Sequence, residues 1–265
     1  MPVAYSFVIN SANLLEFVKA IGAVSHECVL NVTTAGWEVK VLDRSSVLMA
    51  EVSLDRESFV KYPASVSSVS SATGDGVSPR IGIDIERTKE FFQVAKNVDV
   101  CVTIDSELRR LTLSTVDGMF SRSQALIAPE YLSSSVPKQS FDFTFPATVK
   151  IDGGLLVKGL KSCSLIEEHV WFEVDDDKFV LRTQNDSDID RFEMVVPASD
   201  LLGLKPGKAK SLFSSEYLER MYPLFMGNVV ELGIGVDYPL KIAVSRPENP
   251  RMNVVMHLAP RIEEN

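Results

Sequence analysis

The sequence predicts an α+β protein made of two similar tandem domains, each with antiparallel sheets and two helices. Three observations predict this class. Alternation of apolar and polar residues dominates the chain, amphipathic helical segments are few and short, and the order of segments in the first half recurs in the second. With 265 residues, 45% of them hydrophobic, the chain is long enough for two domains that each bury a core.

Four β-hairpins are predicted from pairs of alternating segments separated by polar turns. The clearest pair has the turn Asp105–Glu107 between its strands, and another has the acidic turn Asp175–Lys178. A third turn, Gly235–Pro239, begins and ends with turn-forming residues. The paired segments are 28–32 with 37–42, 98–104 with 108–113, 170–174 with 179–183, and 229–234 with 240–244.

Four short segments have apolar residues at helical spacing and therefore predict amphipathic helices. The last of them opens with Ser214, Ser215 and Glu216, a sequence typical of a helix N-terminus. The four predicted helices are Asn13–Val24, Asp84–Ala95, Gly154–Leu165 and Ser214–Phe225.

The two halves share a pattern rather than identity. Leu14 corresponds to Leu155 at a spacing of 141 residues, whereas Val100 corresponds to Val230 at a spacing of 130. The first half therefore holds extra residues, and the Ser-rich stretch Pro63–Pro79 is predicted to be a mobile inserted loop. Prolines and serines in 128–139 disfavour a helix or a central strand. We expect domains at 1–127 and 141–265, joined by a linker at 128–140.

Charge is distributed unevenly along the chain. The net charge of −9 and a pI near 5.0 argue against a protein that holds nucleic acid by its overall charge. The acidic residues collect in predicted turns and the tail, whereas basic residues recur on the polar faces of the predicted helices. We expect these helix faces to meet phosphates, and the family resemblance given below makes their basic residues the DNA contacts; they are Lys19, Arg87, Lys89, Lys96, Lys158, Lys161 and Arg220.

The alternative is an ordinary solvated helix face, and Glu86, Glu90 and Glu219 on the same helices favour it. An enzyme is a weaker interpretation. His26 and Cys28 alternate on a predicted strand, which is typical of packing, and no phosphate-binding glycine motif follows Gly153 and Gly154. We therefore expect no catalytic residues, no metal site and no cofactor.

The three cysteines fit neither a disulfide framework nor a zinc site, and their odd number and wide spacing fit a reducing compartment. No run of 18 apolar residues predicts a membrane span, and the N-terminus does not resemble a signal peptide. We expect a cytoplasmic protein that associates with the nucleoid, or a nuclear one if the source is eukaryotic.

Four segments, in order along the chain, resemble the DNA sliding clamp family, proliferating cell nuclear antigen (PCNA), in its archaeal form. The C-terminal stretch 258–263 resembles the Leu-Ala-Pro-basic-Ile-Glu ending of that family. Leu42–Val47 resembles its apolar-Asp-x-Ser-x-Val loop, Phe59–Tyr62 its Phe-x-x-Tyr stretch, and Asp237–Leu240 its late hairpin turn. The resemblance covers the whole chain except about residues 64–79.

The resemblance implies a processivity factor for DNA replication and repair. Three subunits would close head to tail into a ring around double-stranded DNA, with helices inside and sheets outside. The strand at Met119–Ile127 would pair with roughly Phe179–Gln184 of the next subunit. Partners would include DNA polymerase, a clamp loader, and flap endonuclease and ligase type proteins.

The resemblance also implies a pocket for partner peptides of the form Gln-x-x-apolar-x-x-aromatic-aromatic. Apolar anchors would supply most of the binding, about 2 kcal/mol or more each, and the linker and tail would add backbone hydrogen bonds. Carried over position by position, the pocket comprises Leu42, Val47, Met49, Val136, Pro137, Pro239, Ala259 and Pro260. For Leu42, Val47 and Met49 the alternative is ordinary strand core. For the whole chain it is a β-rich protein-interaction module that does not encircle DNA.

Overall fold

The computed structural model describes residues 4–64, 66, 80–135, 143–185, 187, 189–246 and 250–262. Most of the predicted insertion, 63–79, and the pocket residues Val136 and Pro137 lie outside the described residues. The described chain divides into two compact units. Unit 1 takes the described residues of 1–44, 50–138 and 249–253, and unit 2 takes those of 45–49, 139–248 and 254–265.

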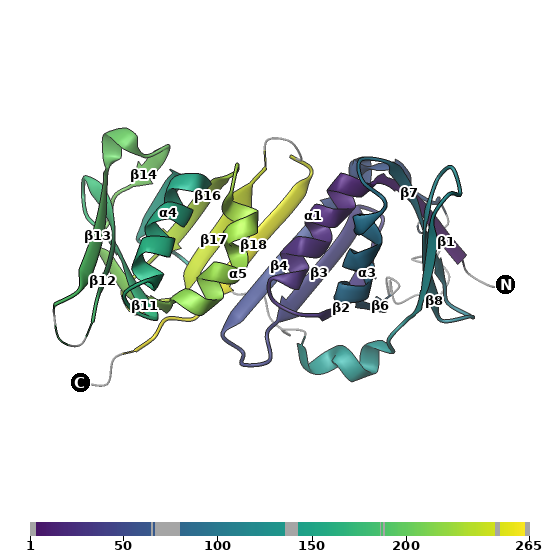
Figure 1. The fold of residues 1–265 in the computed structure, drawn as a ribbon, viewed down its shortest axis with the longest axis horizontal. Helices are drawn as coiled ribbons and strands as arrows, with labels where there is room; N and C mark the ends of the chain where they lie inside the picture. Colours follow the sequence, from purple (N-terminus) through teal and green to yellow (C-terminus); the bar gives the residue numbers. More distant parts are fainter. Residues whose placement is uncertain are drawn as a thin grey trace. The chain divides into compact units, whose positions relative to one another are not determined.

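Unit 1 has two antiparallel groups of strands (Figure 1). Asn10 pairs with Asp99 and Ala4 with Asp105, which fixes the register of the N-terminal strand against the predicted hairpin. The first sheet has the order β5 (Phe59–Lys61), β1 (Ala4–Asn10), β7 (Asp99–Asp105), β8 (Arg110–Thr115) and β9 (Ser121–Ala125). The second group has the order β6 (Arg80–Asp84), β2 (Glu27–Val32), β3 (Gly36–Leu42) and β4 (Leu48–Asp55).

Two helices lie side by side over these strands in unit 1, α1 (Ser11–Gly22) and α3 (Ile85–Glu90) (Figure 1). A 3₁₀ turn, Phe91–Gln93, continues α3. Leu14, Phe17, Val18 and Ile21 form the buried stripe of α1, which explains why this segment is helical and which face it buries. The prediction of one helix over Asp84–Ala95 is therefore correct in place but too long, because the last turn tightens before Ala95.

Unit 2 repeats this arrangement. One sheet has the order β13 (Arg191–Pro197), β12 (Lys178–Gln184), β11 (His169–Val174) and β15 (Ala209–Ser214). The second group has the order β14 (Gly203–Lys205), β10 (Ala147–Asp152), β16 (Val229–Ile234), β17 (Leu240–Ser245) and β18 (Met252–Leu258). The helices α4 (Gly153–Ser164) and α5 (Ser215–Phe225) lie side by side over these strands (Figure 1).

The repeat has a longer offset than the sequence predicts. The helices α1 and α4 begin 142 residues apart, and so do the strands β2 and β11 and the strands β3 and β12. Leu14 therefore corresponds to Leu156, since both are buried, and the predicted match of Leu14 with Leu155 is wrong by one residue. The later offset of 130 is confirmed, because β7 and β16 begin at Asp99 and Val229.

Each unit buries a cluster of aromatic rings between its strands. In unit 1 the ring of Phe7 meets the edge of Trp37 at 5.1 Å between centroids, and Trp37 meets Phe59 at 4.9 Å. In unit 2 the ring of Phe172 meets Phe213 at 5.3 Å with an interplanar angle of 89°. Such edge-to-face pairs contribute about 0.5–1.5 kcal/mol each beyond the area they bury.

Two further predictions need correction. The segment Pro129–Ser135 forms a 3₁₀ helix, although its composition disfavours helix, because Pro is well tolerated in a first helical turn. The strand β12 is hydrogen-bonded on both sides, to β11 and to β13, so Phe179–Gln184 cannot receive a strand from a neighbouring subunit. The edge of that sheet is β13 instead.

Candidate nucleic-acid interface and peptide-binding site

The first helix of unit 1 carries one cation, and a carboxylate on the same helix holds it. The side chain of Asn10 caps α1 by accepting the amide of Ala12 at 2.9 Å, and such a cap is worth about 1 kcal/mol. One turn before the end of the helix, Lys19 Nζ lies 3.1 Å from Glu16 Oε1. Both side chains are about one third exposed, so they form a partly solvated pair on the polar face of α1.

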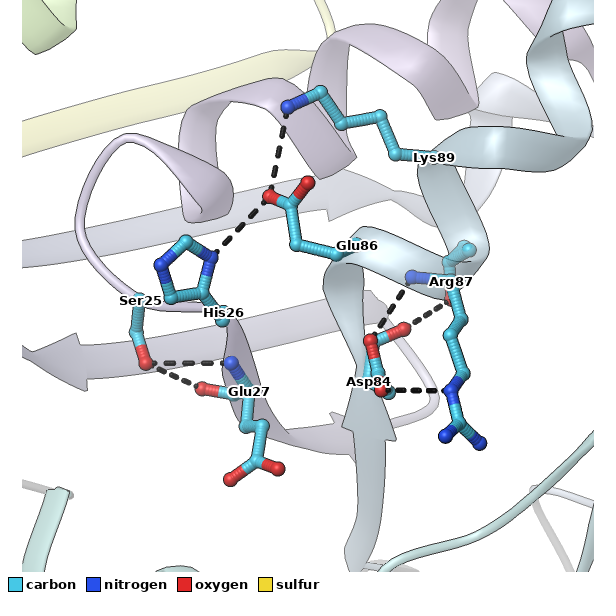
Figure 2. A network of polar contacts seen from close by, with 8 residues as sticks. Ser25, His26, Glu27, Asp84, Glu86, Arg87 and Lys89 are labelled. Atoms are coloured by element: carbon cyan, nitrogen blue, oxygen red, sulfur yellow. Dashed lines mark hydrogen bonds and ion pairs between the residues drawn. The ribbon is translucent and has the colours of Figure 1, made fainter.

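The second helix of unit 1 is more strongly neutralised (Figure 2). Asp84 caps α3 through the amide of Arg87 at 2.9 Å and also pairs with the Arg87 guanidinium at 3.3 Å. Glu86 faces two partners, with its Oε1 3.5 Å from Lys89 Nζ and 3.4 Å from His26 Nδ1. Both predicted cations of α3 therefore have a carboxylate beside them.

Lys96 differs from the prediction because it follows the 3₁₀ turn and lies on no helix. It is exposed, and it borders an open groove of about 410 Å³ between α1 and α3. Leu15 and Phe92 give this groove its apolar lining. Its polar lining has both signs of charge and consists of Glu86, Glu90, Lys89, Gln93 and Lys96.

The first helix of unit 2 differs from both helices of unit 1. Asp152 caps α4 by accepting the amide of Leu155 at 2.8 Å. Lys158 and Lys161 lie three residues apart and are exposed, and neither forms an ion pair with any residue that the structure describes. Lys161 Nζ lies 5.9 Å from the centre of the Tyr222 ring, at the limit of a cation–π contact. Burial raises the pKa of Tyr222 to about 12, so this ring stays neutral.

The second helix of unit 2, α5, carries one cation and two carboxylates. Arg220 pairs with Glu216 one turn earlier and also stacks on Tyr217, with its guanidinium carbon 4.7 Å from the ring centre. Ser214 occupies the N-cap position, which confirms the predicted start of this helix, but its side chain makes no cap bond. Pro223 lies inside the helix, and its missing N–H shortens the hydrogen-bonded ladder.

The predicted peptide pocket is described only in part. Within unit 2 the amide of Ala259 donates to the carbonyl of Val47 at 2.9 Å, which brings the loop before β4 against the end of β18. Val47, Pro239, Ala259 and Pro260 are half-buried, as is Leu42 in unit 1. Met49 is 3% exposed, which fits the alternative of ordinary strand core for that residue.

An aromatic cluster beside Pro239 and Ala259 is absent from the sequence prediction. The ring of Phe143 lies 5.2 Å from Tyr238 and 5.7 Å from His257, and Tyr238 lies 5.6 Å from Phe145. The alternation of Phe141, Phe143 and Phe145 in the sequence is a signal for a half-buried strand, but it does not name Tyr238 or His257 as neighbours.

The C-terminal segment is fixed to unit 2 by two hydrogen bonds from Arg261. Its amide donates to the carbonyl of Leu212 at 2.7 Å, and its Nε donates to His169 Nε2 at 2.8 Å. This holds Ala259 and Pro260 close to the surface of the unit. The tail beyond Ile262 lies outside the described residues.

Two other kinds of feature are absent from the part of the chain that is described. No group of three His, Cys, Asp or Glu side chains there could hold a metal ion. None of the helices there combines the length and apolar character needed to cross a membrane.

Comparison with solved structures shows which fold class the chain belongs to. No protein-family model matches the chain. A solved structure of the C-terminal region of FEN-1 bound to A. fulgidus PCNA superposes with a TM-score of 0.84 at 22% identity, covering 98% of this chain and 100% of that one. A PCNA2–PCNA3 complex from Sulfolobus tokodaii gives a TM-score of 0.78 at 17% identity, covering 97% of this chain and 100% of that one. The fold is that of the PCNA-type clamps.

Sequence similarity gives the nearer relatives. The DNA polymerase sliding clamp of Methanothrix thermoacetophila is 29% identical over 259 residues, which cover 97% of this chain and 98% of that protein. The chain is thus a homologue of archaeal DNA polymerase sliding clamps, and the resemblance seen in its sequence is confirmed.

Proposed function

We propose that the chain is the subunit of a DNA polymerase sliding clamp, a ring that encircles duplex DNA and tethers replication and repair proteins. The observation that carries the proposal is similarity over 97% of the chain to a protein named DNA polymerase sliding clamp, together with a repeated fold of the PCNA type. The clamp acts as a non-catalytic tether, and it works in the cytoplasm on the nucleoid. Its domains are 1–127 and 141–265, joined by the linker 128–140.

Ring closure would use two sheet edges. The edge strand β9 of unit 1 and the edge strand β13 of unit 2 each leave one side of the strand without a partner in the described residues. A head-to-tail contact of β9 with β13 of the next subunit would remove both edges and generates a closed ring if three rotations complete a turn. Exposed Val195 on β13 and exposed Met119 and Phe120 before β9 support burial at this contact.

DNA would be held by topology, so its contacts must be weak and independent of sequence. Lysine and arginine contacts to phosphates fulfil this requirement because they carry no base information. The cations on the four helices are the proposed contacts, with Lys158 and Lys161 as the pair that has no competing carboxylate among the described residues.

Encirclement can be tested without a clamp loader. A linear duplex with free ends admits a ring by threading, whereas the same duplex with both ends blocked by streptavidin does not. By sedimentation we expect a mass near three times 29.3 kDa. We expect the protein to stay bound only to duplex whose ends were blocked after the ring had threaded onto it. A monomer that binds both duplexes equally would contradict the ring and favour the β-rich interaction module.

Partner tethering is tested with a peptide of the form Gln-x-x-apolar-x-x-aromatic-aromatic. The solved PCNA with a bound FEN-1 C-terminal region supports this class of partner. We expect Val47→Asp to weaken the peptide at least 10-fold, because a charge would enter the apolar site. The control is Leu202→Asp, which changes an exposed apolar side chain of unit 2 outside the proposed pocket. Equal affinities of the two variants would contradict this pocket.

A further inference from the structure

We infer that this clamp, if it encircles DNA as proposed above, contacts the duplex mainly through one helix of the four, α4, by Lys158 and Lys161. The cations of α1 and α3 are predicted contacts of the same kind, but carboxylates beside them compete with phosphate. The inference concerns which surface of each subunit carries the DNA contact, and it rests on the proposed function.

The charges of the four helices differ in kind. The helix α4 carries two lysines and no carboxylate between Gly153 and Ser164. The helix α1 carries one lysine and one glutamate, and α3 carries two cations and two glutamates. The helix α5 has two glutamates against one arginine, so α4 alone among them has an excess of positive charge.

The distances to neighbouring carboxylates show that the cations of unit 1 are less available to a phosphate than those of α4. Lys19, Arg87 and Lys89 lie 3.1, 3.3 and 3.5 Å from carboxylate oxygens that the same helix or its cap supplies. A phosphate that binds these cations must displace the carboxylate or accept it as a like-charged neighbour at close range. Lys158 and Lys161 have no such competitor among the described residues.

Geometry also favours α4. Residues three apart lie on one face of a helix, so both ammonium groups reach the same side. Tyr222 of α5 stands beside Lys161 and presents a neutral ring.

The test compares two matched pairs of substitutions in the full-length ring. Lys158→Gln with Lys161→Gln removes the α4 charges, and Lys19→Gln with Lys89→Gln removes two charges from unit 1. Anisotropy of a fluorescent duplex with free ends reports binding over a range of salt concentrations. We expect the α4 pair to weaken binding about 10-fold or more and to lower the salt slope by about 1 for each phosphate that is no longer bound. We expect the unit 1 pair to weaken binding about 2-fold or less.

Two further variants sharpen the result. Glu16→Gln with Glu86→Gln removes the carboxylates beside Lys19 and Lys89, and we expect it to tighten DNA binding and to raise the salt slope. Lys61→Gln with Lys208→Gln removes two exposed lysines that lie on no helix, and it measures the effect of net charge alone. Sedimentation confirms that each variant remains trimeric.

The outcomes separate the inference from the function. If the wild-type ring needs free ends but the α4 pair and the unit 1 pair weaken binding equally, the inference is overturned and the clamp stands. The same holds if Glu16→Gln with Glu86→Gln changes nothing. If the wild-type protein binds blocked and open duplex alike, the proposed function itself is overturned.

Discussion

The helices α1 and α4 begin at corresponding positions, Ser11 and Gly153, and are anchored in the same way. The amide of Ser11 donates to the carbonyl of Val98 at 2.8 Å, and the amide of Gly153 donates to the carbonyl of Asn228 at 2.9 Å. The side chains at these positions differ. The hydroxyl of Ser11 accepts the amide of Val98 at 3.1 Å, whereas a Cβ at Gly153 would lie 1.9 Å from the carbonyl oxygen of Phe225.

The ends of the second helices differ in a similar way. Asn97 and Gly227, 130 residues apart, both have positive φ, at 53° and 75°. Asparagine and glycine are the residues that adopt this conformation most readily, so each unit meets the same backbone demand with a different residue. The two units therefore share a backbone conformation at these positions but fill it with different side chains. Because the shared fold does not require the same side chains in both units, the charges on α4 can differ from those on α1 and α3.

The largest expected effect comes from Gly153→Ala. Its Cβ would meet backbone atoms of Phe225 and Asn228, which cannot move aside as a flexible side chain can, so α4 must shift away from the end of α5. We expect unit 2 to lose about 3 kcal/mol in its free energy of unfolding. Alkylation of the buried thiol of Cys163 in increasing urea measures this unit.

The control for this substitution is Gly154→Ala, where the nearest atom to a new Cβ is an Asp152 side-chain oxygen at 3.1 Å. We expect it to change the unfolding free energy by about 0.5 kcal/mol or less. Ser11→Gly in unit 1 should leave the alkylation of Cys163 unchanged. Equal stability of Gly153→Ala and Gly154→Ala would contradict the close approach at the start of α4.

How much of the molecule could be predicted from sequence depends on the range of the interaction. The hairpins and the helices α1, α4 and α5 follow from local patterns, and the structure confirms them within a few residues. The length of α3 does not follow, because Phe91 and Phe92 continue the apolar stripe while the backbone tightens into a 3₁₀ turn. The prediction that Lys96 lies on a helix is wrong for the same reason, since that helix ends before it.

The candidate site divides in the same way. The pairs Glu16–Lys19 and Glu86–Lys89 have helical i,i+3 spacing, so the sequence alone predicts that each lysine has a carboxylate beside it. The approach of His26 to Glu86 joins residues 60 apart, and the cluster of Phe143, Tyr238 and His257 joins residues more than 90 apart. Such contacts depend on the packing of strands, and neither spacing nor composition predicts them.

Alkaline pH should destabilise both units. Burial raises the pKa of Cys28 in unit 1 and of Cys163 in unit 2 to about 12, from an ordinary value of 9.0. The folded state then holds the protons more tightly than the unfolded chain, so stability is full below pH 9 and falls as pH rises toward 12. We expect each thiol to account for a loss of about 1 kcal/mol at about pH 10.

Urea unfolding followed by tryptophan fluorescence at several pH values measures this loss, since Trp37 lies in unit 1 and Trp171 in unit 2. Cys28→Ala and Cys163→Ala should each flatten the dependence above pH 9, whatever they do to stability at neutral pH. A profile that stays equally steep in both variants would assign the alkaline loss to other groups.

The helix caps should show a smaller contrast. Asp152→Ala removes the oxygen that accepts the Leu155 amide, so we expect unit 2 to lose about 1 kcal/mol. Ser214→Ala removes a side chain at the N-cap of α5 that makes no cap bond, and we expect a change of about 0.3 kcal/mol or less. Urea unfolding measured by alkylation of Cys163 compares the two, and equal losses would mean that Ser214 caps α5 in solution.

The smallest effect on stability is expected for Glu16→Gln, although its effect on DNA binding should be clear. The pair of Glu16 and Lys19 is partly solvated, so we expect a loss of about 0.3 kcal/mol at low salt that vanishes near 1 M salt. Trp37 fluorescence in a Trp171→Phe background measures unit 1 alone, because these are the two tryptophans of the chain. A loss well above 1 kcal/mol would mean that this carboxylate stabilises α1 itself, and tighter DNA binding by its removal would then need a cause other than the release of Lys19.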